Sequence, residues 1–116
     1  MNDFPFPILY QSRDVAIIDK PAGLAVHPGP KTPHSLEDHL PALSMGGFVP
    51  VAAHRLDRDT SGCLAIARSR RGAKWLSAAF SEGGAEKVYW AVLTALPAAP
   101  SGLIDAPLAK VSSAAK

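Results

Sequence analysis

The chain has 116 residues, of which 47% are hydrophobic and 19% are charged, and its net charge is +2 at pH 7. This composition is sufficient for one hydrophobic core, and it excludes a disordered chain, which would combine low hydrophobicity with high net charge. A charge so close to neutral permits nucleic-acid binding without arguing for it. The single cysteine, Cys63, excludes an intramolecular disulfide and a multi-cysteine zinc site.

The apolar stretches are all of strand length. Residues 1–10 contain two prolines, no basic start and no long apolar run, so they do not resemble a secretory signal. Stretches such as YWAVL, at residues 89–93, are far shorter than the ~20 residues that cross a bilayer. Together with the single cysteine, these features predict a soluble cytoplasmic protein without a membrane partner.

The first third of the chain predicts short strands and one short helix. Residues 8–20, ILYQSRDVAIIDK, form two strands separated by a polar turn, and Pro21 with Gly23 ends the second strand. A third extended piece is expected after this turn. Residues 35–40, SLEDHL, predict a short helix in which Ser35 is the N-cap and Asp38 occupies the third position of a capping box.

The rest of the chain alternates strands with one clear helix. Residues 50–53 and 63–67 are apolar and strand-like, and they flank a polar segment. Residues 69–84 predict a helix with Ser69 as its cap, apolar side chains at three- and four-residue spacing, and glycines at its end. Residues 86–95, EKVYWAVLTA, are rich in β-branched and aromatic side chains and predict another strand, with a further extended segment at 102–110.

The order of these elements, β-β-α-β-α-β-β, favours one fold class. Neighbouring strands are hairpin-like, so we expect an α+β fold with a mixed, largely antiparallel central sheet and flanking helices. No linker or change of composition divides the chain, and residues 1–116 are therefore expected to form part of a single domain.

The polar segment at residues 54–62 reads HRLDRDTSG and gathers four charged side chains between two strands. A solvated turn is the simplest interpretation, although a hairpin needs only two to five loop residues. Neighbouring arginines keep a carboxylate ionised, and such a carboxylate can attack carbon or stabilise an oxocarbenium-like centre while the arginines hold phosphates. The residues alone therefore permit an aspartate-based reaction at a sugar phosphate without selecting one.

Two other interpretations of this segment are weaker. DRDT at residues 57–60 is similar to the D-x-D motif of phosphoryl-transferring enzymes, but that motif directly follows an apolar strand, and here three residues intervene. His54, Asp57 and Asp59 are possible metal ligands, but no further ligands cluster around them in the sequence. Cys63 begins a predicted strand and is interpreted as a small core residue.

The segment HRLDRDTSG resembles the signature of the RluA-type pseudouridine synthases, H-R-L-D-x-x-T-S-G, at all seven specified positions. The surrounding sequence agrees. DKPAGLAVHP, at residues 19–28, resembles the family's opening motif D/N-K-P-x-G-x-x-V-H-P. EKVYWAVL resembles the family's K-x-Y-x-A motif, and GLIDAPLAK resembles its G-x-I-x-x-P-L segment, so the resemblance covers residues 8–110.

This resemblance implies roles for individual side chains. Asp57 would be the catalytic aspartate that starts cleavage of the uridine glycosidic bond, by attack at C1′, by attack on the base or by assisting elimination. Tyr89 would stack on the target uracil and take part in proton removal at C5. Arg55 would fill the gap left when the uridine is flipped out of the RNA stack. The implied substrate-binding residues are Arg55, His54, Thr60, Arg68, Arg71 and Lys74, of which His54 and Thr60 also shape the loop.

The resemblance also implies the partners and the extent of the protein. The substrate would be uridine in ribosomal or transfer RNA, and no cofactor or metal is expected, because the isomerisation involves no redox change. The chain lacks the S4 domain that precedes many family members, and nothing in it resembles the family's later G-R-x-H-Q-I-R motif, whose basic residue pairs with the aspartate. We therefore expect the N-terminal part of a catalytic domain, with little turnover by itself; the alternative is an inactive RNA-binding remnant.

Overall fold

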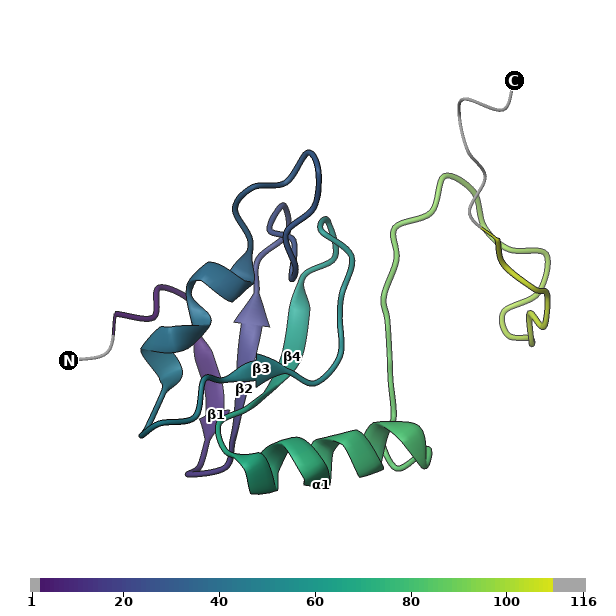
Figure 1. The fold of residues 1–116 in the computed structure, drawn as a ribbon. Helices are drawn as coiled ribbons and strands as arrows, with labels where there is room; N and C mark the ends of the chain where they lie inside the picture. The colour runs from purple at the N-terminus through teal and green to yellow at the C-terminus, as the bar shows by residue number, and fades with distance from the viewer. Residues whose placement is uncertain (1–2, 110–116) are drawn as a thin grey trace.

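A four-stranded antiparallel sheet forms the centre of the protein, as Figure 1 shows. The structure is a computed structural model that describes residues 3–109. Its elements in chain order are the strands β1 (Ile8–Gln11) and β2 (Val15–Lys20), the 3-10 helices η1 (Leu36–Asp38) and η2 (Leu40–Leu43), the strands β3 (Val51–Ala52) and β4 (Gly62–Ala67), and the helix α1 (Arg70–Ser81). The sheet order is β1-β2-β4-β3. These elements confirm the predicted α+β fold with a largely antiparallel sheet.

The two central strands bury side chains on both faces of the sheet. On one face, Ile18 and Leu64 are fully buried and pack with residues of η1 and η2, among them Leu36. On the opposite face, Ala65 packs with Leu76 of α1. Because successive side chains of a strand point to opposite faces, the apolar runs predicted for β2 and β4 match strands that are covered on both sides.

Several local signals in the sequence are confirmed. The side chain of Ser35 accepts a hydrogen bond at the start of η1, and Asp38 completes the capping box. Ser69 caps α1 by accepting a bond from the backbone N–H of Gly72, and Gly83 follows the helix with a φ of 75°. The third extended piece expected after the Pro21 turn is wrong, because within residues 24–34 the structure has only an isolated bridge.

Helix α1 approaches the turn between β1 and β2 very closely. A Cβ atom at position 72 would lie 1.9 Å from the carbonyl oxygen of Asp14, so only glycine permits this approach. Two polar contacts fix the junction: the Ser69 hydroxyl bonds to the Asp14 carboxylate at 2.5 Å, and the Arg68 N–H donates to the Asp14 carbonyl at 2.8 Å. The start of the helix is therefore rigidly attached to the edge of the sheet.

The strand predicted over residues 86–95 is not present. In the part of the chain that the structure describes, residues 86–109 form neither helix nor strand, and the chain after α1 first rises beside the sheet without pairing with it (Figure 1). Trp90 is 96% exposed and Leu96 is 94% exposed. A strand is stable only when another strand accepts and donates its backbone hydrogen bonds, and the described residues supply none here. None of the described helices is long and apolar enough to cross a membrane.

Candidate active site

The segment 54–61 connects β3 to β4 and forms a short, anchored loop. Leu56 is buried in the core, whereas Arg55 and Asp57 on either side of it are exposed. The Thr60 N–H donates to the Asp57 carbonyl at 3.0 Å, which closes a tight turn. An apolar anchor between two exposed polar residues therefore presents Asp57 to solvent on a defined backbone.

Lys20 holds this loop from the opposite side. The whole residue is buried, and its Nζ donates to the carbonyl oxygens of Pro21 at 2.8 Å, Leu24 at 2.6 Å and Arg58 at 3.0 Å. The Gly23 N–H also donates to the Arg58 carbonyl, at 2.7 Å. Three carbonyls match the three donors of an ammonium group, so the DKPAG turn and the Asp57 loop are fastened together by one side chain. These contacts give Lys20 a structural role in the protein.

His54 fixes the other end of the loop to the sheet and to α1. Its Nε2 accepts a hydrogen bond from the backbone N–H of Ala65 at 3.0 Å. Its ring stacks on Phe80 of α1, with ring centroids 4.6 Å apart and planes 28° apart. The residue that begins the signature thus joins β4, α1 and the Asp57 loop. The spacing along residues 69–84 predicted that Phe80 lies on the apolar face of the helix, but nothing in the sequence indicated that it stacks on His54.

Burial favours the neutral form of the His54 ring, because it lowers the pKa of this side chain. Desolvation lowers the pKa of His54 below its usual 6.5, the positive charge of Lys87 lowers it further, and the Arg55 backbone opposes both effects. Since Nε2 accepts a hydrogen bond, the proton of the neutral ring is assigned to Nδ1. Nδ1 is buried and has no hydrogen-bond partner among the described residues. Protonation would place a charge at a site arranged for a neutral ring.

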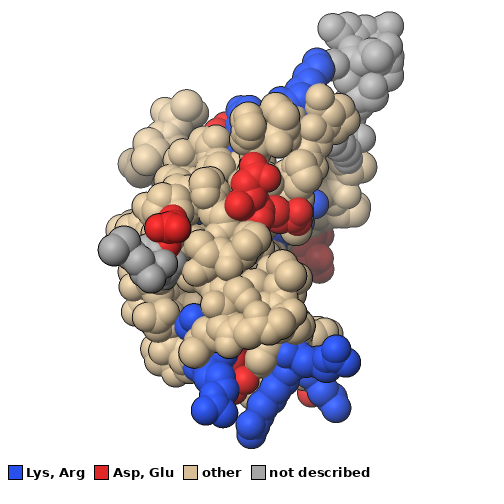
Figure 2. Space-filling view, turned by 60° about the vertical axis from the view of Figure 1, so that its left-hand side comes forward, with Lys and Arg blue, Asp and Glu red and all other residues tan. Residues whose placement is uncertain are grey.

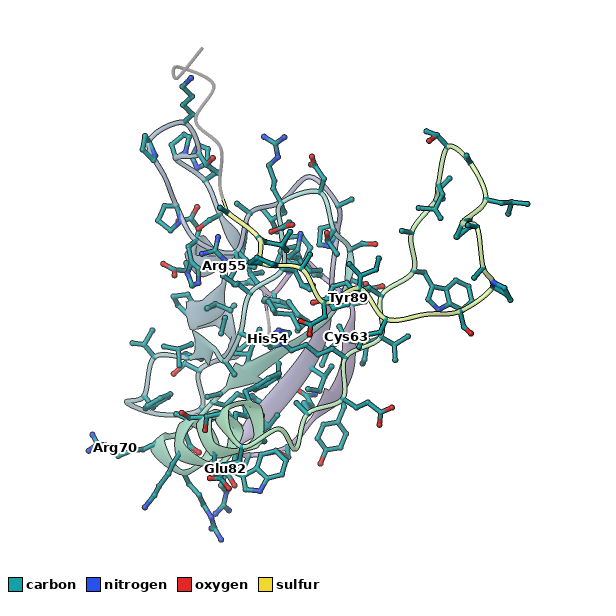
Figure 3. All side chains as sticks on the ribbon, turned by 90° about the vertical axis from the view of Figure 1, so that its right-hand side faces the viewer. His54, Arg55, Cys63, Arg70, Glu82 and Tyr89 are labelled. Carbon is teal, nitrogen blue, oxygen red and sulfur yellow. The ribbon has the colours of Figure 1, made fainter. Side chains whose placement is uncertain are left out.

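A cleft of about 670 Å³ opens beside the loop, between β4 and the segment that follows α1. Its lining includes His54, Thr60 and Tyr89, three of the predicted site residues, together with Cys63. Figure 3 shows His54, Cys63 and Tyr89 close to one another. Cys63 is exposed, so its interpretation as a core residue is wrong: its side chain lies on the sheet face beyond the part that α1 covers. Asp57 lies outside the residues that line the cleft.

The charges of the loop are mostly in contact with solvent. Arg58 forms an exposed ion pair with Asp59, with Nε 3.2 Å from Oδ1, and this partner lowers the pKa of Asp59. The carboxylate of Asp57 makes no hydrogen bond or ion pair with the described residues. The carboxylate of Asp57, the predicted catalytic group, is therefore accessible, and the neighbouring Arg58 is paired with Asp59 instead.

Three of the predicted substrate-binding residues, which we call the basic cluster, do not lie next to Asp57: Arg68, Arg71 and Lys74. The loop precedes β4 and Arg68 follows it, and the six residues of this strand span about 20 Å. Arg71 and Lys74 are exposed on α1, and Arg70 lies at the N-terminal end of this helix in Figure 3. Arg68 is half-buried, and its guanidinium donates to the carbonyls of Leu43 and Ser12, both at 2.9 Å, and to the side chain of Gln11 at 3.2 Å. Its role in RNA binding stays a prediction.

The metal interpretation gains no support from the geometry. Within residues 3–109, no group of three or more His, Cys, Asp or Glu side chains is arranged to hold a metal ion. The three side chains considered as ligands have different surroundings: His54 faces Phe80, Asp59 pairs with Arg58, and Asp57 is exposed.

The fold and the anchored aspartate loop define the class of protein, and comparison with known sequences agrees. Residues 14–116 match the family described as RNA pseudouridylate synthase, and the chain belongs to this family. It is 47% identical over 107 residues to an uncharacterized RNA pseudouridine synthase of Zymomonas mobilis, covering 91% of this chain and 49% of the relative. It is 35% identical over 115 residues to the ribosomal large subunit pseudouridine synthase D of Xanthomonas campestris, covering 92% of this chain and 33% of that protein.

A solved structure supports the same assignment. Human RNA pseudouridylate synthase domain containing 4 superposes with a TM-score of 0.54 at 31% identity, over 66% of this chain and 30% of that chain. The chain thus spans about a third to a half of the length of these relatives. The comparisons confirm the resemblance that the HRLDRDTSG segment indicated.

Proposed function

We propose that this protein isomerises uridine to pseudouridine in RNA. In this reaction the bond between C1′ and N1 of the uracil breaks, a bond between C1′ and C5 forms, C5 loses its proton and N1 gains one. The observation that carries the proposal is the Asp57 loop, which Leu56, Lys20 and His54 hold in place while its carboxylate remains exposed. A rigid backbone beneath an accessible group is what a positioned catalytic residue requires.

Asp57 and Tyr89 have separate roles in this proposal. Asp57 starts the cleavage of the glycosidic bond, and Tyr89, at the cleft beside the loop, stacks on the detached or flipped uracil. Arg55 is exposed next to Asp57 and occupies the vacated position in the RNA stack. Thr60 supports the turn through its backbone and lines the cleft. The tyrosine is 58% exposed, so it is free to contact a base.

The site is completed by polypeptide that the relatives contain and this chain does not. Asp57 has no basic partner among the described residues, and the apolar segment after α1 is largely exposed. We propose that the remaining half of the domain supplies the cation that pairs with Asp57 and the strands that cover residues 86–95. The 116 residues alone are then expected to show little turnover.

The experiment joins this chain to the remaining C-terminal part of the Zymomonas mobilis relative. RNA carrying tritium at C5 of uridine serves as the substrate, because forming the C1′–C5 bond releases that hydrogen to water. The joined protein should release tritium, and the separate 116-residue chain should not. If the joined protein folds and binds RNA but releases nothing, the alternative of an inactive RNA-binding remnant replaces the proposal.

The proposal extends to the class of RNA that the protein modifies. One relative is named for the large ribosomal subunit, which favours ribosomal RNA, with transfer RNA as the second candidate. Separate tritiated ribosomal and transfer RNA fractions in the same assay distinguish the two. Independence from cofactors and a cytoplasmic location stay predictions.

A further inference from the structure

A second groove lies on the sheet, away from the Asp57 loop. It has a volume of about 490 Å³, and its lining includes Tyr10 of β1, together with Arg71 and Trp75 of α1. Tyr10 pairs with Ile17 across the strands, so both side chains lie on the sheet face that α1 covers. The helix covers β2 and β4 but leaves Tyr10, on the edge strand, beside the groove.

Both aromatic rings at this groove are more than half exposed: Trp75 by 65% and Tyr10 by 59%. They come from elements whose relative position is fixed, because α1 is attached to the β1–β2 turn through Gly72, Ser69 and Asp14. Two exposed rings on rigid elements form a platform on which flat, apolar groups can stack without further ordering of the protein.

The surroundings of the groove are basic. Arg70, Arg71 and Lys74 lie on α1, no acidic side chain is present in its first turn, and Arg13 lies in the adjacent turn. Figure 2 shows Lys and Arg side chains gathered at the level of α1 and this turn. The carboxylate of Asp14 also lines the groove, but it accepts the hydrogen bond of Ser69.

We propose that this groove binds an unpaired stretch of RNA, with a base stacked between Tyr10 and Trp75 and phosphates held by Arg71 and its basic neighbours. Aromatic platforms combined with a positive surface are the general means by which proteins bind single-stranded nucleic acid. The inference rests on the proposed function, and it identifies a contact on the edge strand β1, which β2 separates from β4 and the Asp57 loop. The groove therefore holds RNA that flanks the target uridine.

The test measures RNA binding and requires no turnover. An unstructured oligouridine of about 12 nucleotides, labelled with a fluorophore, is titrated with the chain at low salt. Trp75→Leu keeps apolar bulk but lacks an aromatic face, and Tyr10→Leu does the same on β1. Each should weaken binding about fivefold or more, the loss typical of one stacked base, whereas Trp75→Phe should stay within about threefold of the original chain.

Leu96→Ala is the control, because Leu96 is even more exposed, lies on the segment after α1 and lines neither the groove nor the cleft beside the Asp57 loop. It should change binding by less than about twofold, and Arg71→Gln should reduce the salt dependence by about 0.7 in the slope of log affinity against log salt. Circular dichroism checks that each variant folds.

The proposal is overturned if the oligouridine does not bind, if the leucine variants of Tyr10 and Trp75 bind as tightly as the original chain, or if Leu96→Ala weakens binding equally. It is also overturned if a fully paired hairpin binds as tightly, because paired bases cannot enter the groove. Loss of binding in Trp75→Leu without tritium release from the joined protein would contradict the proposed function alone. Tritium release with unchanged binding in these variants would contradict the groove alone.

Discussion

Replacing Lys20 with methionine removes the side chain that fastens the DKPAG turn to the Asp57 loop. The Arg58 carbonyl keeps its bond from the Gly23 N–H, but the carbonyls of Pro21 and Leu24 lose the Lys20 donor. Each carbonyl left unsatisfied costs about 1–3 kcal/mol, and the desolvation that lowers the pKa of Lys20 offsets part of this loss when the charge is removed. We expect Lys20→Met to reduce the free energy of unfolding by about 2–4 kcal/mol.

Urea denaturation of the 116-residue chain, followed by far-ultraviolet circular dichroism, measures this loss. A decrease of 2–4 kcal/mol corresponds to a midpoint lower by about 1–3 M, given the usual dependence on denaturant for a small domain. Lys31→Met is the control, because Lys31 is exposed, and it should stay within about 0.5 kcal/mol of the original chain. If Lys20→Met were equally close to the original chain, the three hydrogen bonds would not hold the loop.

Two further predictions concern the anchors of the fold. His54 has a pKa below 6.5, so as the pH falls through that value the unfolded chain takes up the proton first, and stability present above pH 6.5 is lost towards the folded-state pKa. His54→Gln, whose amide oxygen can reach the position of Nε2 and accept from the Ala65 N–H but does not titrate, should make the urea midpoint less dependent on pH between about 7 and 5. Arg68→Met should reduce the free energy of unfolding by about 1–3 kcal/mol, because the carbonyls of Leu43 and Ser12 lose their donor.

A specific result would contradict each of these two predictions. An equally steep acid dependence in His54→Gln would show that other groups cause the acid destabilisation. For Arg68→Met the control is Arg70→Gln, whose side chain is exposed at the start of α1 and should change stability by less than about 0.5 kcal/mol. Equal stability of the two arginine variants would show that the hydrogen bonds of Arg68 to Leu43 and Ser12 do not stabilise the fold.

The sequence predicted those elements whose own residues determine them. The apolar runs of β2 and β4, the Ser69 cap and the spacing along α1 are local signals, and the structure confirms them. The strand over residues 86–95 has an equally strong local pattern, yet it is not formed, because a strand depends on a partner that the described residues do not supply. The error therefore arises from an absent neighbour and not from the composition of the segment.

In the candidate site, too, the sequence predicted only what adjacent residues determine. The HRLDRDTSG pattern identified the loop and Asp57, since the match depends only on adjacent residues. The position of the basic cluster could not be inferred, because β4 separates Arg68 from the loop by about 20 Å although the two are close in sequence. The contacts of Lys20 with Arg58 and of His54 with Phe80 join distant parts of the chain, and no local pattern contains them.

The central claim is that Asp57 carries out the isomerisation of uridine, and one substitution tests it most directly. Asp57→Asn is introduced into the protein that joins this chain to the C-terminal part of the Zymomonas mobilis relative, and tritium release from C5 of uridine is measured beside the unsubstituted protein. Asp57 is exposed and its side chain holds no other described residue, so the variant should fold and bind RNA normally. We predict that tritium release falls to background; release at the rate of the unsubstituted protein would contradict the account.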